Sequence, residues 1–359
     1  MESAFEEGSG VQDRRYTRRS VTVTAGAAFA LGSVGKALAT QATPGVNPDS
    51  SPAASPVGGE WSYTDVMGTT VTLPEAPKVI AANLIPAAAL WDLGITVDAV
   101  FDWTASAHPD GDHIAWGSIA PDAVANVGDA DGNILPEDLL KIHPDVILAY
   151  TFDPADPSGI SGIVPEMWET LNQIAPVLVV TDNASTEVQL QRFVDLAASL
   201  GADVNAPAIA AAREAYEAKV AEVQAVIAAQ AAIEVIFADV DPDAFYVAGP
   251  KNIAELKFLT SLGMSFANAD SSEADEFWET LSLEEVLKYP ADIFYNDVYS
   301  AWTTLEDLQA QPATGAMPAV QAGQVGEWLR DFPVSYAGIA AFLDAVLVPL
   351  RDAQRVRPA

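Results

Sequence analysis

Hydrophobic and polar positions along the first half of the chain predict strands and helices in alternation. Residues 78–82 form a compact apolar run typical of a buried strand, and residues 85–93 follow helical spacing until Gly94. Residues 61–73 alternate around Met67-Gly68, which predicts a short hairpin. Further strands are predicted at 99–101, 145–150 and 177–181, and further helices at 137–142, 164–174 and 186–200. This order indicates an α/β lobe with parallel strands.

One helix in the middle of the chain differs from the others in length. It opens at Pro207, continues to residue 232, and is filled with Ala, Glu, Lys and Gln without an internal Gly or Pro. At 1.5 Å per residue, a helix of about 25 residues spans roughly 40 Å. Because one small lobe does not need such a length, we expect this helix to bridge two lobes and to permit only modest lobe motion.

The second half of the chain repeats the strand and helix pattern. Strands are predicted at 234–238, 245–247 and 292–295, with an extended segment at 324–328, and helices at 253–262, 283–288, 304–309 and 335–350. We therefore predict an α/β fold of two lobes with mostly parallel sheets, bridged by one long α-helix. The predicted divisions are a signal peptide at 1–39, a flexible linker at 40–60, an N-terminal lobe at 61–205, the linking helix at 206–232 and a C-terminal lobe at 233–359.

The N-terminus has the pattern of an export signal. Arg18-Arg19 precedes a short, weakly hydrophobic stretch that runs to Gly35, and this resembles a signal peptide of the twin-arginine type. We expect cleavage after Ala39, with a site after Ala42 as the alternative, and an uncleaved N-terminal anchor as the competing interpretation. Pro, Ser, Gly and Ala dominate residues 40–60, which is typical of a flexible tether.

Composition excludes several functional classes. The 359 residues include 50 Asp and Glu but only 17 Lys and Arg, and the formal net charge is −33. Removal of residues 1–39 takes away five basic and four acidic residues, so the charge becomes −34. Such an acidic surface repels phosphates, which argues against nucleic acid or a membrane surface as the main partner and is typical of soluble exported proteins. The absence of cysteine excludes disulfides, thiolate metal sites and a lipid anchor on cysteine.

A short segment recurs once in each predicted lobe. In the first, Glu137 opens a helix and Asp145 precedes a buried strand; in the second, Glu284 and Asp292 have the same eight-residue separation. A carboxylate in the first turn of a helix is favoured by the helix dipole, and this accounts for part of the pattern. It does not account for the recurrence in both lobes.

With this repeat, the chain from about Thr64 to Leu350 resembles the periplasmic-binding-protein family that serves ABC importers of iron–siderophores, heme and cobalamin. The resemblance includes segments 65–74, 89–94, 136–145, 246–249, 259–263 and 281–284. It implies two lobes joined by one rigid helix, no catalysis and no cofactor. It also implies that Glu137 and Glu284 each engage a basic pocket on one subunit of a permease dimer, which works with an ATPase.

The sequence departs from the family pattern at two points. Ala291 replaces the proline expected before Asp292, and the proline stands one place earlier at Pro290. Because no cysteine is present for lipidation, retention near a transporter would require an outer membrane or another wall barrier, and otherwise the protein would be released.

Ligands of open α/β lobes bind outside the carboxyl ends of the strands, so the loops there supply the candidate binding residues. Arg330 is the preferred candidate because its fork-shaped cation suits anionic donor atoms, and Lys251 is the other cation in these loops. The aromatic candidates, suited to a bulky and partly apolar ligand, are Trp103, Tyr150, Tyr246, Tyr299, Trp302 and Trp328, with Trp116 and Phe152 in the same loops. Taken singly, each of these aromatic residues fits core packing better than ligand contact.

The scarcity of cations in these loops favours a neutral or weakly charged ferric siderophore of the hydroxamate or mixed-ligand type over an anionic catecholate. Heme and cobalamin remain alternative ligands, because aromatic walls suit all three. His108 and His113 lie five residues apart with Asp110 and Asp112 between them, but Pro109 and Gly111 in the same segment favour a solvated loop without a metal. A secreted hydrolase that uses carboxylates, and an adhesion module, are the alternatives of other classes.

Overall fold

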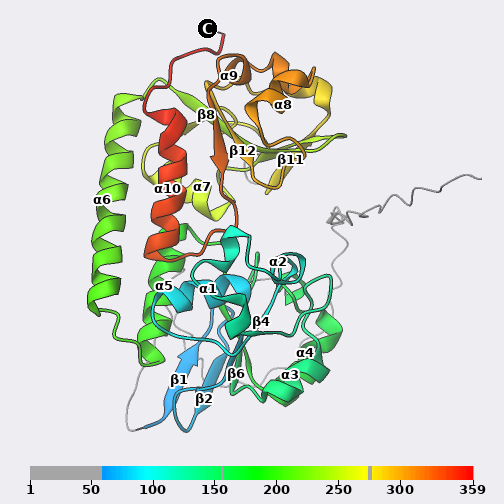
Figure 1. The fold of residues 1–359 in the computed structure, drawn as a ribbon, viewed down its shortest axis with the longest axis vertical. Helices are drawn as coiled ribbons and strands as arrows, with labels where there is room; N and C mark the ends of the chain where they lie inside the picture. Colours follow the sequence, from blue (N-terminus) through cyan, green and yellow to red (C-terminus); the bar gives the residue numbers. More distant parts are fainter. Residues whose placement is uncertain (1–58, 155–156, 274–276, 359) are drawn as a thin grey trace, which may run out of the picture. The chain divides into compact units, whose positions relative to one another are not determined.

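The computed structural model describes residues 59–154, 157–273 and 277–358. The predicted signal peptide and nearly all of the predicted linker lie outside these residues. Within them, the chain forms two α/β lobes, and Figure 1 shows the helices and strands of each. The predicted fold class is confirmed.

The N-terminal lobe is built on a parallel sheet with the strand order β5-β4-β3-β6-β7. Its strands are β3 (Ile80–Asn83), β4 (Ala99–Phe101), β5 (Ala125–Asn126), β6 (Val146–Tyr150) and β7 (Val177–Thr181). Its helices are α1 (Leu84–Asp92), α2 (Trp103–Ala107), α3 (Pro136–Ile142), α4 (Trp168–Ile174) and α5 (Thr186–Ser199). Before the sheet, β1 (Trp61–Thr64) and β2 (Thr70–Leu73) pair antiparallel as the predicted hairpin. Short 3₁₀ turns lie at 114–116, 121–123, 157–159 and 165–167.

The C-terminal lobe has a mixed sheet with the order β11-β9-β8-β12-β13, and β10 also pairs with β8. Its strands are β8 (Glu234–Val240), β9 (Phe245–Ala248), β10 (Ser265–Phe266), β11 (Trp278–Leu281), β12 (Ile293–Asp297) and β13 (Val325–Trp328). Its helices are α7 (Ala254–Ser261), α8 (Leu305–Ala310), α9 (Pro318–Gln321) and α10 (Tyr336–Leu350). The pairs β8–β9 and β9–β11 are antiparallel. The turn from β8 to β9 has four residues, which is too short for a parallel crossover.

The predicted long helix is α6 (Pro207–Ala229), and its two ends contact different lobes. Near its start, the Cδ1 atom of Ile209 lies 3.9 Å from an ideal Cβ position at Gly94, in the N-terminal lobe. Near its end, Ile227 approaches Gly263 of the C-terminal lobe in the same way, at 3.6 Å. The helix therefore bridges the lobes, as expected.

Helix α10 runs beside α6 and provides a second connection (Figure 1). At its N-terminus, the Ser335 hydroxyl lies 2.5 Å from a carboxylate oxygen of Asp92 in α1. Along its length, the ammonium of Lys219 in α6 lies 2.7 Å from Asp344 in α10. The sequence did not predict this second bridge.

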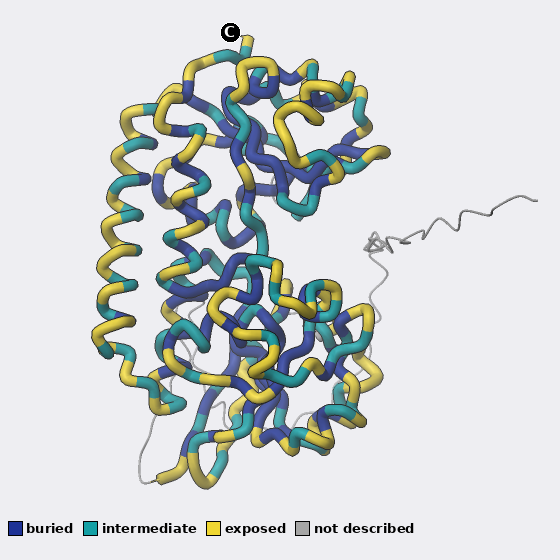
Figure 2. Tube along the Cα trace, in the orientation of Figure 1, coloured by how far each residue is buried: buried dark blue, intermediate teal, exposed yellow. Residues whose placement is uncertain are grey.

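One hydrophobic cluster extends through both lobes. It contains residues on one face of each central sheet, such as Leu148 and Tyr295, together with Val223 of α6 and Phe342 of α10. Separate clusters cover the opposite faces of the two sheets. In Figure 2 the central strands of both lobes are coloured as buried. The lobes thus share apolar packing in addition to the covalent connections.

The predicted helix at 283–288 is only a 3₁₀ turn over Leu283–Glu285. Ser282 and Glu285 form a reciprocal capping box that closes this turn. The next residues then turn toward β11, where Lys288 and Tyr289 both contact the carboxylate of Glu279. These side-chain contacts replace the helix that the residue pattern predicted. Another 3₁₀ turn lies at 314–316.

Candidate ligand-binding site

Loops that follow the carboxyl ends of strands bring the two lobes into contact. Trp103, after β4, and Tyr299, after β12, have ring centroids 6.1 Å apart. Phe152, after β6, packs edge to face against Phe277, with centroids 5.7 Å apart. The strand-end rule therefore located the facing surfaces of the lobes correctly.

Arg330 follows β13 and lies among aromatic rings and carboxylates. Its guanidinium carbon is 4.5 Å from the centroid of the Tyr299 ring and 5.5 Å from that of Trp278. Its Nε atom lies 2.7 Å from Oδ2 of Asp297, an ion contact outside hydrogen-bond alignment. The side chain of Asp297 is fully buried, while 27% of the Arg330 side chain is exposed. The guanidinium is thus held by Asp297 and the two aromatic rings, while part of the side chain remains accessible.

The buried ion pair changes the titration of both partners. Burial raises the pKa of Asp297 to about 7, although the charge of Arg330 acts in the opposite direction. Burial lowers the pKa of Arg330, but the carboxylates of Asp297 and Asp331 outweigh that effect and keep its pKa above the ordinary value. Arg330 therefore carries a permanent charge at this site.

Asp331 has a backbone conformation that is uncommon for a residue with a side chain. Its φ angle is 62°, in the left-handed region. Its Oδ2 atom accepts a hydrogen bond of 3.1 Å from the Tyr299 hydroxyl. Burial, and then the charge of Asp331, raise the pKa of Tyr299, so this phenol stays protonated as the donor.

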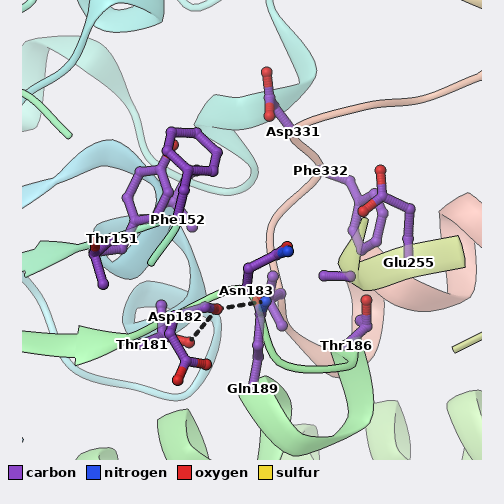
Figure 3. A pocket seen from close by; sticks show the side chains of 14 residues that line it. Thr151, Phe152, Thr181, Asp182, Asn183, Thr186, Gln189, Glu255, Asp331 and Phe332 are labelled. Atoms are coloured by element: carbon purple, nitrogen blue, oxygen red, sulfur yellow. Dashed lines mark hydrogen bonds between the residues drawn. The ribbon is translucent and has the colours of Figure 1, made fainter. Parts of the chain in front are cut away.

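A pocket of about 100 Å³ lies between the lobes beside this network. Figure 3 shows the side chains around it, with Phe152 on one side, Phe332 and Glu255 on another, and Asn183 between them. The N-terminal lobe contributes Phe152, Asp182 and Asn183, and the C-terminal lobe contributes Glu255, Asp331 and Phe332. The pocket is therefore completed only when both lobes are present.

Glu255 lies in the first turn of α7 and reaches this pocket. Its Oε1 atom accepts a hydrogen bond of 3.0 Å from the indole N–H of Trp328. Burial raises the pKa of Glu255, and the negative charge of Asp331 acts in the same direction. A positive charge placed near this carboxylate would favour its ionised form.

The cations near the pocket already have partners. In the N-terminal lobe, Arg192 lies 2.5 Å from Oδ1 of Asp182, and both side chains are largely buried. From α7, Lys257 donates to the backbone oxygen of Asn183 at 2.5 Å. Asn183 of the N-terminal lobe also donates to Asn252 of the C-terminal lobe, so these hydrogen bonds connect the two lobes at the pocket.

His108 and His113 belong to an aromatic cluster. Their ring centroids are 4.9 Å apart, and His113 stacks on Tyr299 at 5.1 Å. Nδ1 of His108 lies 2.8 Å from Asp112. Burial, and then the charge of His108, lower the pKa of His113. Among the described residues, no group of three or more His, Cys, Asp or Glu could hold a metal ion.

The aromatic candidates are divided between the lobe contact and the cores. Trp103, Tyr150 and Tyr299 lie at the lobe contact, with Tyr150 packing against Phe152 and lining the pocket. Trp328 is fully buried and packs against Trp278, so it offers no surface to a ligand. Trp302 packs against the cluster on the opposite face of the C-terminal sheet.

Three other candidates occupy different positions. Tyr246 in β9 alternates with the core residues Phe245 and Val247, so it points to the other face of the sheet. Lys251 is exposed in the turn before α7. Trp116 is buried and its indole donates to the backbone oxygen of His108 at 2.8 Å.

Sequence reasoning missed several residues of the pocket. Asp331 stands next to Arg330 after β13, and Asp182 and Asn183 follow β7, so the strand-end rule could have identified all three. Phe332 stands in the same loop as Asp331 and has the same signal, whereas Glu255 has none. Glu255 is placed by the packing of α7, and Phe332 by stacking on Phe342, with centroids 4.6 Å apart.

The repeated glutamates lie on the surface, and each has an exposed leucine three residues later. Glu137 is exposed in α3, and Leu140 is 50% exposed. Glu284 is exposed in the 283–285 turn, and Leu287 is 48% exposed. The aspartates of the repeat have a structural role, because Asp145 accepts hydrogen bonds from the backbone of Lys78 and Val79, and Asp292 accepts from that of Glu234.

The family model described as "Periplasmic binding protein" matches residues 79–330 of this chain. The chain belongs to this family. The periplasmic binding proteins act outside the cytoplasm, and membership gives this chain an extracytoplasmic location. None of the helices in the described ranges is long and apolar enough to cross a membrane.

Solved structures support this assignment, whereas no curated protein matches the chain. DesE, a ferric-siderophore receptor protein from Streptomyces coelicolor, is 31% identical, with a TM-score of 0.72 over 82% of this chain and 99% of that chain. PiaA from Streptococcus pneumoniae TIGR4 in complex with ferrichrome is 20% identical, with a TM-score of 0.53 over 82% and 99% of the two chains. FhuD from Vibrio cholerae, bound to Fe³⁺–Desferal, is 21% identical, with a TM-score of 0.54 over 79% and 100%.

At their lower identities, PiaA and FhuD show the two-lobed fold alone. DesE shares both the fold and nearly a third of the aligned residues. The family and these neighbours are binding proteins, which agrees with an interlobe pocket assembled from two lobes.

Proposed function

We propose that this protein captures a ferric siderophore between its two lobes and delivers it to an ABC importer, without catalysis of its own. The observation that carries the proposal is the 31% identity to the ferric-siderophore receptor DesE over 99% of that chain. The aromatic side chains at the lobe contact and the partly exposed guanidinium of Arg330 support the proposal, because they suit a bulky chelate with oxygen donors.

The electrostatics of the site favour a neutral or weakly charged chelate, such as a ferric hydroxamate. Arg330 is paired with Asp297, and Arg192 is paired with Asp182, so neither brings an uncompensated positive charge. An anionic triscatecholate complex would require such charge to replace its hydration. The chemistry of the described residues therefore supports the hydroxamate class.

Ligand-linked thermal stabilisation, together with tryptophan fluorescence quenching, tests the proposal. A ligand at 100 times its Kd stabilises the folded state by about 2.7 kcal/mol, which raises the melting temperature measurably. We expect such stabilisation with a ferric trishydroxamate and not with ferric ion alone. Stabilisation by heme alone, or by cobalamin alone, would show that this compound and not a siderophore is the ligand. Turnover in a hydrolase screen would contradict the absence of catalysis.

We further propose that Glu137 and Glu284 dock the two lobes onto a permease dimer that works with an ATPase. The repeat gives each lobe one exposed glutamate, which matches a partner with two related subunits, and Leu140 and Leu287 add an apolar contact beside each glutamate. The Leu140→Ser/Leu287→Ser double variant should weaken stimulation of the transporter ATPase while leaving ligand affinity unchanged. Unchanged stimulation of the ATPase would show that the two leucines are not part of the docking surface.

Residues 1–39 are proposed to direct export through the twin-arginine pathway and to be removed near Ala39. The adjacent Arg18 and Arg19 before a weakly hydrophobic stretch support this. N-terminal sequencing of the exported protein should give Thr40 as its first residue. Export that survives Arg18→Lys/Arg19→Lys would contradict the twin-arginine assignment.

A further inference from the structure

The interlobe pocket is too small to hold a whole ferric chelate. Its volume is about 100 Å³, whereas sites that enclose a complete small molecule generally have ~300–1,000 Å³. Asp331, which lines it, accepts a hydrogen bond from Tyr299, whose ring packs against Arg330, and the chelate itself is proposed to bind at these two residues. A pocket of this size next to the main site suits one arm of the ligand.

The charges that line this pocket have one sign. Its charged lining residues among those described are Asp182, Glu255 and Asp331. Asp182 is neutralised by Arg192 at 2.5 Å. Glu255 and Asp331 accept hydrogen bonds only from neutral donors, the Trp328 indole and the Tyr299 hydroxyl, and neither occurs in an ion pair of the described residues. The charge of Arg330 acts on both carboxylates, but Arg330 is already ion-paired with Asp297, so negative charges remain in excess.

The nearest cations are already engaged. The ammonium of Lys257 donates to the backbone oxygen of Asn183 at 2.5 Å, and Arg330 forms its ion pair with Asp297. Desolvation of the Glu255 carboxylate costs free energy, which a cation supplied by the ligand would offset. A positively charged guest would therefore reduce the excess of negative charge along the pocket wall.

The remaining walls suit an aliphatic stem behind such a charge. Phe152 and Phe332 lie on different sides of the pocket in Figure 3, and Ile85 and Val334 add apolar surface. Aromatic faces also attract an ammonium group. Methylene groups would pack against these side chains while the charged end reaches the carboxylates.

We propose that this pocket binds a primary ammonium group at the end of an aliphatic arm of the ferric chelate, with Glu255 and Asp331 as its recognition residues. The inference rests on the proposed siderophore function and narrows its ligand to cationic chelates. A bare metal ion is a poorer occupant, because the described residues form no cluster of three metal-ligating side chains here.

Two matched probes test the proposal. Fe³⁺–Desferal ends in a primary ammonium group, and its N-acetylated form carries a neutral amide at the same place, so the chelating part is identical. The wild-type protein should bind the ammonium form at least about tenfold more tightly, which corresponds to ~1.4 kcal/mol. The preference should decrease with added salt, because it is electrostatic.

The Glu255→Gln/Asp331→Asn double variant should bind both probes with similar affinity, near that of the wild type for the acetylated form. The glutamine introduced by Glu255→Gln keeps an acceptor for the Trp328 indole, so the packing of α7 is preserved. Glu306→Gln, at an exposed acid of the same lobe, is the matched control and should keep the preference. Melting curves report whether each variant is folded; if the double variant does not fold, the single variants are measured, and each should reduce the preference.

Equal wild-type affinities for the two probes, or a preference that survives removal of both carboxylates, would overturn the ammonium assignment while leaving siderophore capture intact. Failure of the wild type to bind either probe, with tight binding of heme or cobalamin, would instead overturn the proposed function and this inference with it.

Discussion

Arg330 and Asp297 form an ion pair in which the carboxylate is fully buried and the guanidinium keeps an exposed edge. The buried partner holds the cation in place, and the guanidinium also lies over the ring of Tyr299. Replacement of either partner would leave the other with an unpaired charge, which is costly in a buried setting. The pair therefore links ligand binding to the stability of the C-terminal lobe.

Arg330→Lys should weaken binding of a ferric trishydroxamate by at least about tenfold. Lysine keeps the charge but lacks the planar fork that can contact Asp297 and a ligand oxygen together. Isothermal titration measures the affinity, with Arg355→Lys, at an exposed arginine, as the control. An affinity within twofold of that of the wild type would show that Arg330 does not contribute to ligand binding.

Because of Asp297, the free energy of unfolding should fall as pH rises from about 4 to about 7. Its folded-state pKa is about 7, above the ordinary value of 3.8, so in this range the folded protein holds a proton that the unfolded chain has lost. The slope for one proton is at most about 1.4 kcal/mol per pH unit. Urea unfolding of the wild type and of Asp297→Asn at several pH values measures it. A difference between the two proteins that is constant with pH would contradict the prediction.

Gly132→Ala should destabilise the protein and weaken ligand binding through Trp103. The φ angle of Gly132 is 81°, and a Cβ atom there would lie 2.0 Å from the backbone nitrogen of Trp103. The left-handed conformation costs ~1–2 kcal/mol for alanine, and the overlap adds about 1–3 kcal/mol. Gly201→Ala is the matched control, since its φ is 98° but nothing lies within 4 Å. Equal losses of unfolding free energy in both variants would contradict the predicted overlap.

Charge reversal of both docking residues, in Glu137→Arg/Glu284→Arg, should reduce iron uptake more than tenfold and leave the ligand Kd within twofold. Both side chains are exposed, so their replacement should not affect folding. Uptake of radioactive iron as its chelate measures the effect, and Glu214→Arg/Glu306→Arg provides a control with the same change of net charge. A loss of ligand affinity in the first double variant would place the glutamates in the ligand site.

The sequence pattern predicted most of the fold because local signals agree with the final packing. Strand β7 and strand β4 were located to the residue, and the long helix α6 begins at the predicted Pro207. The helix predicted at 283–288 was too long, because the turn ends at Glu285. The residues after it contact the carboxylate of Glu279 in β11 instead of continuing a helix. Side-chain contacts of that kind leave no periodic signal.

The candidate site was predicted less completely. Proximity to a strand end correctly placed Arg330, Tyr150 and Tyr299 at the lobe contact. It could not distinguish Trp328, which is fully buried, because sequence position does not determine which way a side chain points. Glu255 was missed because it reaches the pocket only through the docking of α7 against α5.

The hydrophobic cluster that continues from the N-terminal sheet through α6 and α10 into the C-terminal sheet has a consequence for how such proteins diversify. Neither half could be exchanged for the corresponding half of a relative without exposing apolar surface or creating voids along the shared seam. New ligand specificities are therefore expected to arise by substitution within the loops between the lobes, with the halves inherited together.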